Sequence, residues 1–142
     1  MTMPLALMML VLGLAQAAPT DPPTGTLTVR LTGFTHARGS ARISLTDSAG
    51  FLGAGRALRV ASVTVRDGQA TVVFEAVPRG RYAVQAYHDE NNNRRLDRNF
   101  LGIPSEPYGF SNNVRSATRA PAYEEAAFTL AGAAMTLDIR IR

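Results

Sequence analysis

Apolar and polar residues alternate along several short stretches of this chain, which is the pattern of half-buried β-strands. In TLTVRLT, Leu27, Val29 and Leu31 fall on one face, and threonine and arginine fall on the other. The same period of two recurs in ARISL, VASVTV, ATVVFEAV, GRYAVQAYH, EAAFTL and AMTLDIRIR. About seven such runs, with turn signals between most of them and no convincing amphipathic helix, predict one all-β domain. The predicted fold is a single antiparallel β-sandwich, transthyretin-like or immunoglobulin-like.

Two turn signals refine this picture. Asp67-Gly68 lies between VASVTV and ATVVFEAV, and both residues take positive φ at low cost, which predicts a two-residue hairpin. The Pro-x-Gly-x-Tyr turn in VPRGRYAV starts the next strand, where the ring of Tyr82 would pack and its hydroxyl would seek a backbone acceptor. Along that strand Tyr82 and His88 fall on the same face.

The chain begins with an apolar run, MPLALMMLVLGLAQA, that ends in the small-x-small pattern Ala15-Gln16-Ala17. This pattern predicts a signal peptide over residues 1–17, cleaved before Ala18. The apolar core is too short to cross a bilayer, which takes about 20 residues, so we expect no transmembrane segment in the mature chain. Residues 18–24 read as a flexible, proline-rich lead-in, and 25–142 as the β-sandwich domain. We therefore expect a periplasmic or secreted protein.

Composition narrows the chemistry. The chain contains no cysteine, which excludes disulfides, thiolate catalysis and cysteine-based zinc sites. Its formal net charge of +4 is carried by arginines that are scattered along the chain. Nucleic-acid binding requires clustered positive charge, and export argues against it as well, so we expect no nucleic-acid partner.

One connection, from residue 89 to about 121, is much longer than an ordinary loop. It contains Phe100, Leu101, Ile103, Tyr108 and Phe110, which make it too apolar for a disordered segment. We expect an ordered loop that packs on the sandwich.

This loop opens with oxygen-bearing side chains at a calcium-loop spacing. Asp89, Asn91, Asn93 and Asp97 reproduce positions 1, 3, 5 and 9 of that loop, and Arg95 at position 7 would offer its carbonyl. A tightly turning backbone points alternate side chains at one centre, where a hard cation gains several oxygens. The spacing predicts a structural Ca²⁺ site.

Three departures from the calcium pattern leave an alternative open. Arg94 stands where glycine is usual, and Phe100 stands where a bidentate glutamate is usual, so Glu106 or Glu90 would have to supply a remote carboxylate. The acidic and basic residues of 89–98 also balance, which weakens attraction for a divalent ion. The alternative is an Asx turn in which the side chains cap their own backbone.

The stretch YHDENNNRRLDRNFLGIPSEPYGFSNN resembles the signature of a bacterial exported family, domain of unknown function 2141. The resemblance covers residues 25–142 and implies the fold and export but no reaction. Arg94 departs from it, since glycine is typical there. The chain matches the pattern at His88, Asp89, Asn91, Asn93, Leu96, Asp97, Asn99, Gly102, Pro104, Glu106, Gly109, Phe110, Ser111 and Asn112.

An ion in this loop would fix residues 89–112 in one shape that presents a binding surface. We expect His88, Tyr108, Phe110 and Asn112 to contribute to it, and an envelope protein or a glycan to be the partner. His36 falls in an apparent turn and is expected to face water.

Two other functions compete with this hypothesis. The first is a binding module for a glycan or protein that needs no metal. The second, weaker one is a small hydrolase that uses Asp97 with Glu106, or His88 with Ser105 or Ser111. Neither serine lies in a nucleophile-elbow sequence, so we expect a protein that is not an enzyme.

Overall fold

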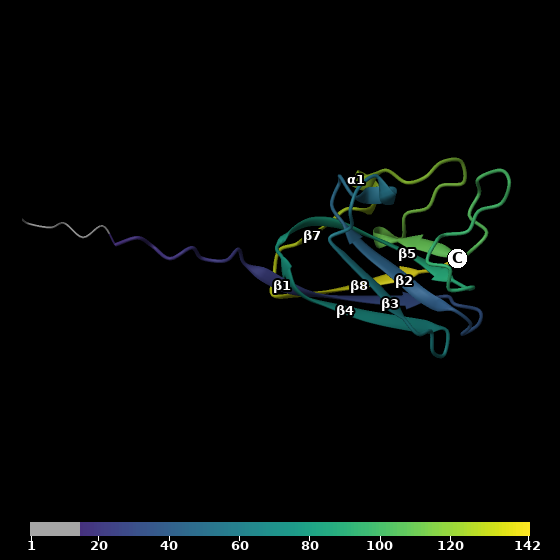
Figure 1. Cartoon of the computed structure of the whole chain (residues 1–142), viewed down its shortest axis with the longest axis horizontal. Helices are drawn as coiled ribbons and strands as arrows, with labels where there is room; N and C mark the ends of the chain where they lie inside the picture. The colour runs from purple at the N-terminus through teal and green to yellow at the C-terminus, as the bar shows by residue number, and fades with distance from the viewer. Residues whose placement is uncertain (1–14) are drawn as a thin grey trace, which may run out of the picture.

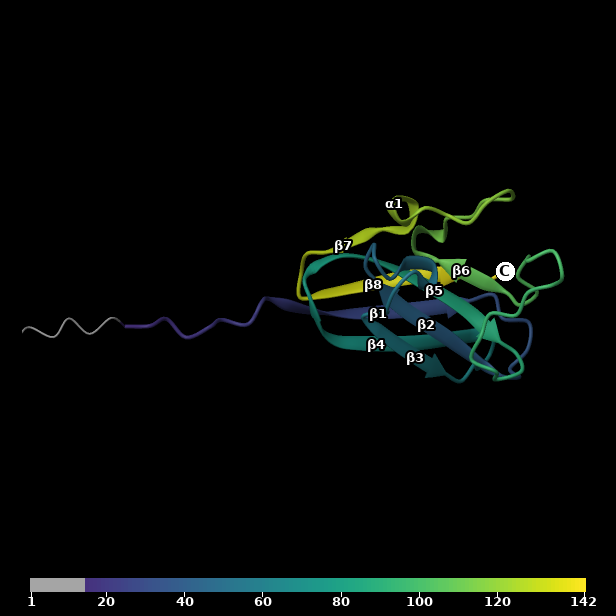
Figure 2. The same ribbon diagram turned by 45° about the horizontal axis from the view of Figure 1, so that its top comes forward.

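Two β-sheets pack face to face in the computed structural model, which describes residues 15–142 (Figures 1 and 2). The prediction of an all-β sandwich is confirmed. The predicted signal peptide lies outside the described residues except for its last three, and residues 15–23 extend away from the sandwich without regular structure. The elements are β1 (Thr24–Thr32), β2 (Ser40–Thr46), η1 (Phe51–Gly53), β3 (Arg59–Val63), β4 (Gln69–Pro78), β5 (Gly80–Asp89), β6 (Tyr108–Phe110), η2 (Ser111–Asn113), α1 (Tyr123–Ala126), β7 (Phe128–Leu130) and β8 (Ala134–Arg140).

The first sheet has the strand order β4-β1-β8, with β1 in the middle. β1 pairs antiparallel with β4 but parallel with β8, in a register that sets Leu27 beside Met135. The parallel pair was not part of the predicted antiparallel pattern. It joins the first and last strands of the domain, which nearly the whole chain separates.

The second sheet has the order β3-β2-β5-β6, and β7 also pairs with β5. β2 and β5 pair antiparallel, with Ala41 opposite His88. This register brings the end of β5 next to the loop between β1 and β2, and the candidate site lies there. Among the residues that the model describes, no helix has the length and apolar character needed to span a membrane.

The alternating pattern correctly identified the inward faces of the central strands. Leu27, Val29 and Leu31 are at most 1% exposed, and Tyr82 and His88 share one face of β5, as their spacing predicts, which is the buried face. The Tyr82 hydroxyl donates to the carbonyl of Pro78 at 2.7 Å, which is the local backbone bond expected from the turn before it.

The prediction of a hairpin at Asp67-Gly68 is wrong: the turn forms, but its two flanking strands join different sheets. Both residues have positive φ, and Arg66 bridges Gln69 across them. However, β3 pairs with β2, and β4 pairs with β1, so the chain crosses from one sheet to the other at this point. A short turn fixes the local direction of the chain but not the sheet that each flanking strand joins.

A second, smaller apolar cluster covers the outer face of β5. It consists of Phe51, Ala83, Phe110 and Ala126, with Tyr108, Val114 and Tyr123 packed at its edge. Through these contacts η1, β6 and α1 attach to the sandwich, and the long connection after β5 becomes an ordered cover, as predicted.

Candidate functional site

The long loop starts at Asp89, the last residue of β5, whose side chain is only 1% exposed. Its two carboxylate oxygens accept hydrogen bonds from the backbone amides of Asn93, at 3.1 Å, and Arg94, at 2.9 Å. Asp89 thus holds the first turn of the loop against the end of the strand. Its carboxylate faces the main chain, which is the arrangement of an Asx turn.

The carboxylate of Asp97 is the point on which two asparagine side chains converge. The amide nitrogens of Asn91 and Asn93 each donate to one of its oxygens at 2.6 Å. The amide oxygens of the same two residues accept from the backbone: Asn91 from the amide of Asn93 at 3.2 Å, and Asn93 from Arg95 at 2.9 Å. Three of the four predicted side chains therefore meet, but their amide nitrogens point to the centre.

Arg94 occupies the backbone conformation that a glycine would take at this position. Its φ is +66°, and Asn92 two residues earlier has a φ of +55°. An L-residue in this left-handed region carries a cost of about 1–2 kcal/mol. The turn at position 6 of the loop thus forms in spite of the arginine, with the backbone bond to Asp89 holding it in place.

Glu106 ties the two arms of the loop together. It is 6% exposed, and its oxygens accept from the backbone amides of Glu90 at 2.9 Å and Asp97 at 3.0 Å. Each oxygen keeps a further lone pair. The side chain of Glu90, the other candidate for a remote carboxylate, turns instead toward two histidines.

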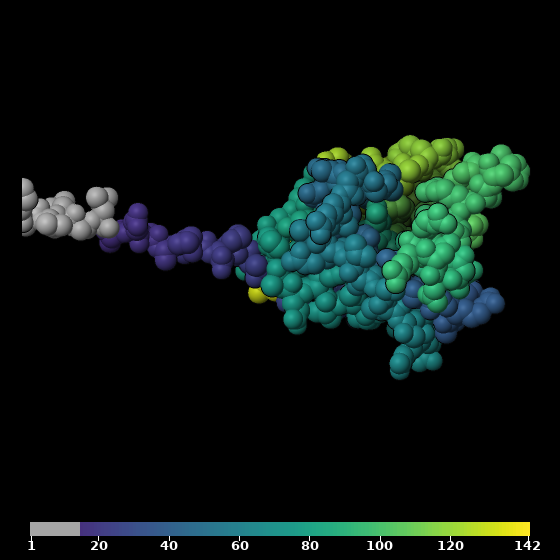
Figure 3. Space-filling view, in the orientation of Figure 1, coloured from purple at the N-terminus to yellow at the C-terminus, as the bar shows by residue number. Residues whose placement is uncertain are grey.

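A groove of about 520 Å³ lies beside this loop on the outer face of the second sheet. Its floor includes Ser44, Gln85 and Tyr87, and the loop contributes one wall through Leu96, Arg98 and residues 102–104. Leu52 and the segment 116–121 complete the rim. Figure 3 shows the hollow on the face where the green atoms of the loop approach the blue atoms around η1.

Of the four residues expected on a binding surface, Tyr108 best meets the expectation. It lines the groove half-buried, with the Arg115 guanidinium 4.8 Å from its ring centre. His88 is completely buried, so its assignment to the surface is wrong, because its strand position faces the core. Phe110 touches the groove but is only 8% exposed, since it packs in the second cluster.

Asn112 is exposed, but its amide is already used. It donates to the carbonyls of Glu125, at 3.1 Å, and Ala127, at 2.9 Å. With a φ of +61° it turns the chain after β6 and fastens α1 to that turn. Its role is structural.

Several ionisable groups near the groove have shifted pKa values, among them Tyr87 and Glu125. Burial raises the pKa of Tyr87, which forms part of the floor. The hydrogen bonds from Arg119 lower the pKa of Glu125 to about 2, and a bond from the Ala122 amide adds to this. Arg119 donates to both carboxylate oxygens, at 2.7 and 2.8 Å, so its position on the rim is fixed.

The hydrolase arrangement of His88 with Ser111 does not form. One nitrogen of His88 contacts the carbonyl of Arg38 at 2.6 Å, and the other faces Glu90. The Ser111 hydroxyl is buried and bonds the backbone of Val84 and Ala126.

Sequence reasoning missed the position of His36, which is half-buried against His88 rather than fully in water. Its ring centre lies 4.7 Å from that of His88, and only 27% of its side chain is exposed. The two residues are far apart in the sequence. Only the pairing of β2 with β5, which sets Ala41 opposite His88, points to their proximity.

A family model described as an uncharacterised protein conserved in bacteria, domain of unknown function 2141, matches residues 29–138. No curated protein and no solved structure matches the chain.

Proposed function

Since the chain belongs to the bacterial family of domain of unknown function 2141, whose members are uncharacterised, we propose a function from its own geometry. The protein is an exported binding domain in which Ca²⁺ stabilises the loop 89–112. This loop forms a wall of a groove that receives a protein partner. The meeting of Asn91, Asn93 and Asp97 at one point carries the proposal.

The calcium step requires a small rearrangement. The oxygen and nitrogen of an asparagine amide are nearly equal in size, so a half-turn of the group exchanges them. A half-turn at Asn91 and Asn93 brings both amide oxygens next to the Asp97 carboxylate. It also breaks the bonds that these oxygens accept from the backbone amides of Asn93 and Arg95, so ion binding has to offset their loss. An ion at their centre takes the place of the two donated hydrogen bonds, and the Arg95 carbonyl and a free lone pair of Asp89 or Glu106 complete the oxygen shell.

The balance of charge in the loop sets the affinity. Arg94, Arg95 and Arg98 offset the nearby carboxylates, so we expect a dissociation constant of about 10⁻⁴–10⁻³ M, as in extracellular modules. At 100 times the dissociation constant, binding adds about 2.7 kcal/mol to the free energy of unfolding. For a domain of this size that raises the melting temperature by about 10 °C.

The test is thermal unfolding and calorimetric titration with CaCl₂, MgCl₂ and EDTA. If the dissociation constant is about 10⁻⁴ M, we expect about 10 mM CaCl₂ to raise the melting temperature by about 10 °C, and a weaker constant gives a smaller increase. Asp97→Asn should abolish the increase. Asp47→Asn is the matched control, because Asp47 also caps a turn, at the Gly50 amide, but lies outside the loop. An unchanged melting temperature of the unmodified protein in CaCl₂ would remove the ion from the proposal.

The exposed side chains of the loop favour a protein partner over a glycan. Phe100 is 96% exposed, Leu101 67% and Ile103 54%, and Ile103 lies on the groove wall. A group of exposed apolar side chains is typical of a protein-binding site. Phe100 offers a sugar a flat ring, but Leu101 and Ile103 offer neither a ring for stacking nor hydrogen bonds.

A random peptide library displayed on phage probes the groove directly. We expect peptides that bind the protein in CaCl₂ and lose at least ten-fold in affinity with Tyr108→Ala or Ile103→Ser. Val73→Ser is the control, since Val73 is equally exposed, at 51%, but lies on the other sheet. Binding on a glycan array that Tyr108→Ala removes, without any peptide binding, would refute the protein partner and favour the glycan module.

Export is tested separately. Expression of the full chain in a Gram-negative host should yield a periplasmic or secreted protein whose N-terminal residue is Ala18. Retention of the intact chain in the cytoplasm would contradict this part of the proposal.

A further inference from the structure

His88 has a buried ring nitrogen that no hydrogen bond satisfies. The side chain is 0% exposed, and its Nε2 lies 2.6 Å from the carbonyl of Arg38. A carbonyl oxygen only accepts, so Nε2 carries the proton and donates. In the neutral ring Nδ1 then holds a lone pair, and this atom is buried without a partner. A buried polar atom left in this way has a cost, and its presence needs an explanation.

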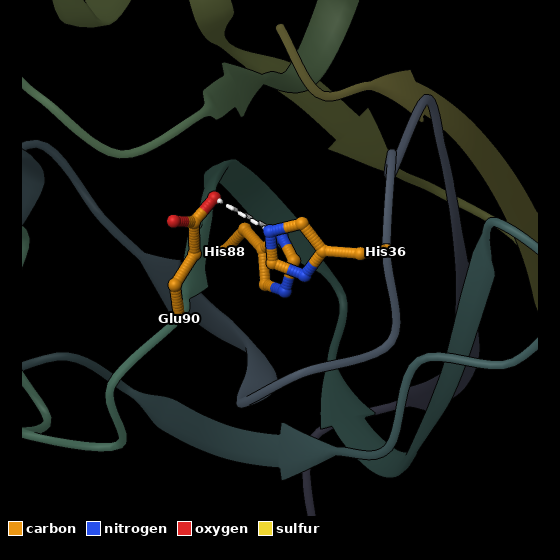
Figure 4. Close-up of side chains that lie close together, drawn as sticks. All are labelled: His36, His88 and Glu90. Atoms are coloured by element: carbon orange, nitrogen blue, oxygen red, sulfur yellow. Dashed lines mark ion pairs between the residues drawn. The ribbon is translucent and has the colours of Figure 1, made fainter.

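The lone pair faces two other possible ligands. His88 Nδ1 is 3.8 Å from Oε1 of Glu90, and the same oxygen is 3.2 Å from Nε2 of His36 (Figure 4). All three ligand atoms lie within 4.8 Å of one another. The half-buried side chains of His36 and Glu90 form the side of this cluster that water can reach.

We propose that His36, His88 and Glu90 form a binding site for a divalent transition-metal ion of the zinc and copper class. Zinc and copper ions bind imidazole nitrogen well, whereas Ca²⁺ and Mg²⁺ prefer oxygen ligands, so a set of two imidazoles and one carboxylate favours the zinc and copper class. Bonds of about 2.0–2.1 Å set the ligands of a tetrahedral ion about 3.3 Å apart. The spacings of 3.2 and 3.8 Å to Glu90 are close to this value, and the two histidine nitrogens lie within 4.8 Å of each other, so the side chains have to close on the ion to bind it.

The contact with Arg38 supports this assignment. Metal-bound histidines donate their other ring nitrogen to a carbonyl or carboxylate, which fixes the ring and its tautomer. His88 has this bond already, and Phe34 packs edge-on against the ring at 5.0 Å. The ring is therefore held in position before any ion arrives.

The loop between β1 and β2 is held close to the end of β5 by a glycine. A Cβ atom on Gly39 would lie 2.0 Å from the carbonyl oxygen of Asp89, and the φ of Gly39 is +73°. Only glycine permits this approach, and the approach brings His36 and the Arg38 carbonyl to His88. The cluster is thus built by the fold.

His36 undergoes one change on binding. Its Nδ1 accepts a hydrogen bond of 3.3 Å from the Arg38 amide, so the proton is on Nε2, where it faces Glu90. Coordination through Nε2 moves this proton to Nδ1 and releases the exposed Arg38 amide to water. Three protein ligands leave the fourth tetrahedral position open on the solvent side for water or a small anion.

Zinc titration tests the site independently of the calcium loop. ZnCl₂ is titrated by calorimetry into the full chain, freed of metal by a chelator and kept in excess CaCl₂. We expect one ion per chain, and a loss of affinity of 10–100-fold in His36→Gln and in Glu90→Gln. Both changes keep a polar side chain of similar length. Glu124→Gln, an exposed glutamate paired with Arg81 elsewhere on the surface, is the control and should bind zinc unchanged.

Ring ¹⁵N shifts identify the ligand atoms. On zinc addition the signals of His88 Nδ1 and His36 Nε2 should move to the metal-bound range, while His88 Nε2 keeps its proton. No saturable zinc binding by the unmodified protein would overturn the proposal. Binding that both His36→Gln and Glu90→Gln leave intact would overturn it as well, and so would coordination through His88 Nε2. None of these results affects the calcium proposal, which depends on other residues.

Discussion

Replacing Arg94 by glycine should stabilise the domain, although the change removes a whole side chain. Arg94 is exposed and has a φ of +66°, and its only backbone bond to the loop, from its amide to Asp89, survives the substitution. Glycine removes the cost of about 1–2 kcal/mol that an L-residue carries in this conformation. The greater freedom of glycine in the unfolded chain costs about 0.5–1 kcal/mol. The net gain lies between about 0 and 1.5 kcal/mol, which is up to about 6 °C in melting temperature.

The neighbouring residue provides a matched control. Arg95 is exposed as well, and its amide also bonds a side chain of the loop, the Oδ1 of Asn93, but it is not among the residues of positive φ. Arg95→Gly removes the same charge from the same loop and gains no relief of strain. It should lower the free energy of unfolding by about 0.5–1 kcal/mol.

Chemical unfolding of the two variants in EDTA measures the difference without a contribution from ions. We expect Arg94→Gly to be more stable than Arg95→Gly by about 1–2 kcal/mol, with equal denaturant slopes. Equal destabilisation by both substitutions would refute the reasoning, because it would mean that the backbone at Arg94 carries no strain.

Three further predictions concern single side chains. Glu106→Gln turns the NH2 of a side-chain amide, itself a donor, toward one of the two backbone amides that Glu106 accepts from, and it should cost about 1.5–3 kcal/mol in chemical unfolding. A loss below about 0.5 kcal/mol would show that water replaces the bond. Ser111→Ala leaves the buried Val84 amide without its acceptor and should cost about 1–3 kcal/mol, and an unchanged midpoint would contradict this. Because Glu125 has a pKa lowered from 4.5 to about 2, its stabilising contribution is complete above about pH 5 and disappears toward pH 2. The melting temperature of the unmodified protein should therefore exceed that of Glu125→Gln at pH 6 and approach it near pH 2, and a constant difference would contradict the assignment.

The sandwich could be predicted because burial of one face imposes a period of two on each strand. Leu27, Val29 and Leu31 carried this signal clearly, and all three are in the core. The pairing of the strands carried no such signal. The turn at Asp67-Gly68 formed as predicted, yet its flanking strands joined different sheets, because sheet membership depends on contacts far along the chain.

In the candidate site, too, the local backbone geometry was predictable from the sequence, and the contacts between distant segments were not. The spacing of Asp89, Asn91, Asn93 and Asp97 correctly identified a turning loop, since that spacing reflects local backbone geometry. It could not tell which atoms point inward, because an Asx turn and an ion site use the same residues. His36 went unrecognised because its contact with His88 exists only after two distant strands have paired.

The parallel pairing of β1 with β8 has a consequence for the order in which the domain is made. Synthesis runs from the N-terminus, so β1 can pair with β4 early but must wait for β8 until residues 134–140 have been made. Until then one edge of the central strand is open, and open edges invite pairing with other chains. Emergence of β8 from the ribosome is thus the event that closes the first sheet. Premature stop codons before Ala134 remove β8 and should therefore yield an aggregating product.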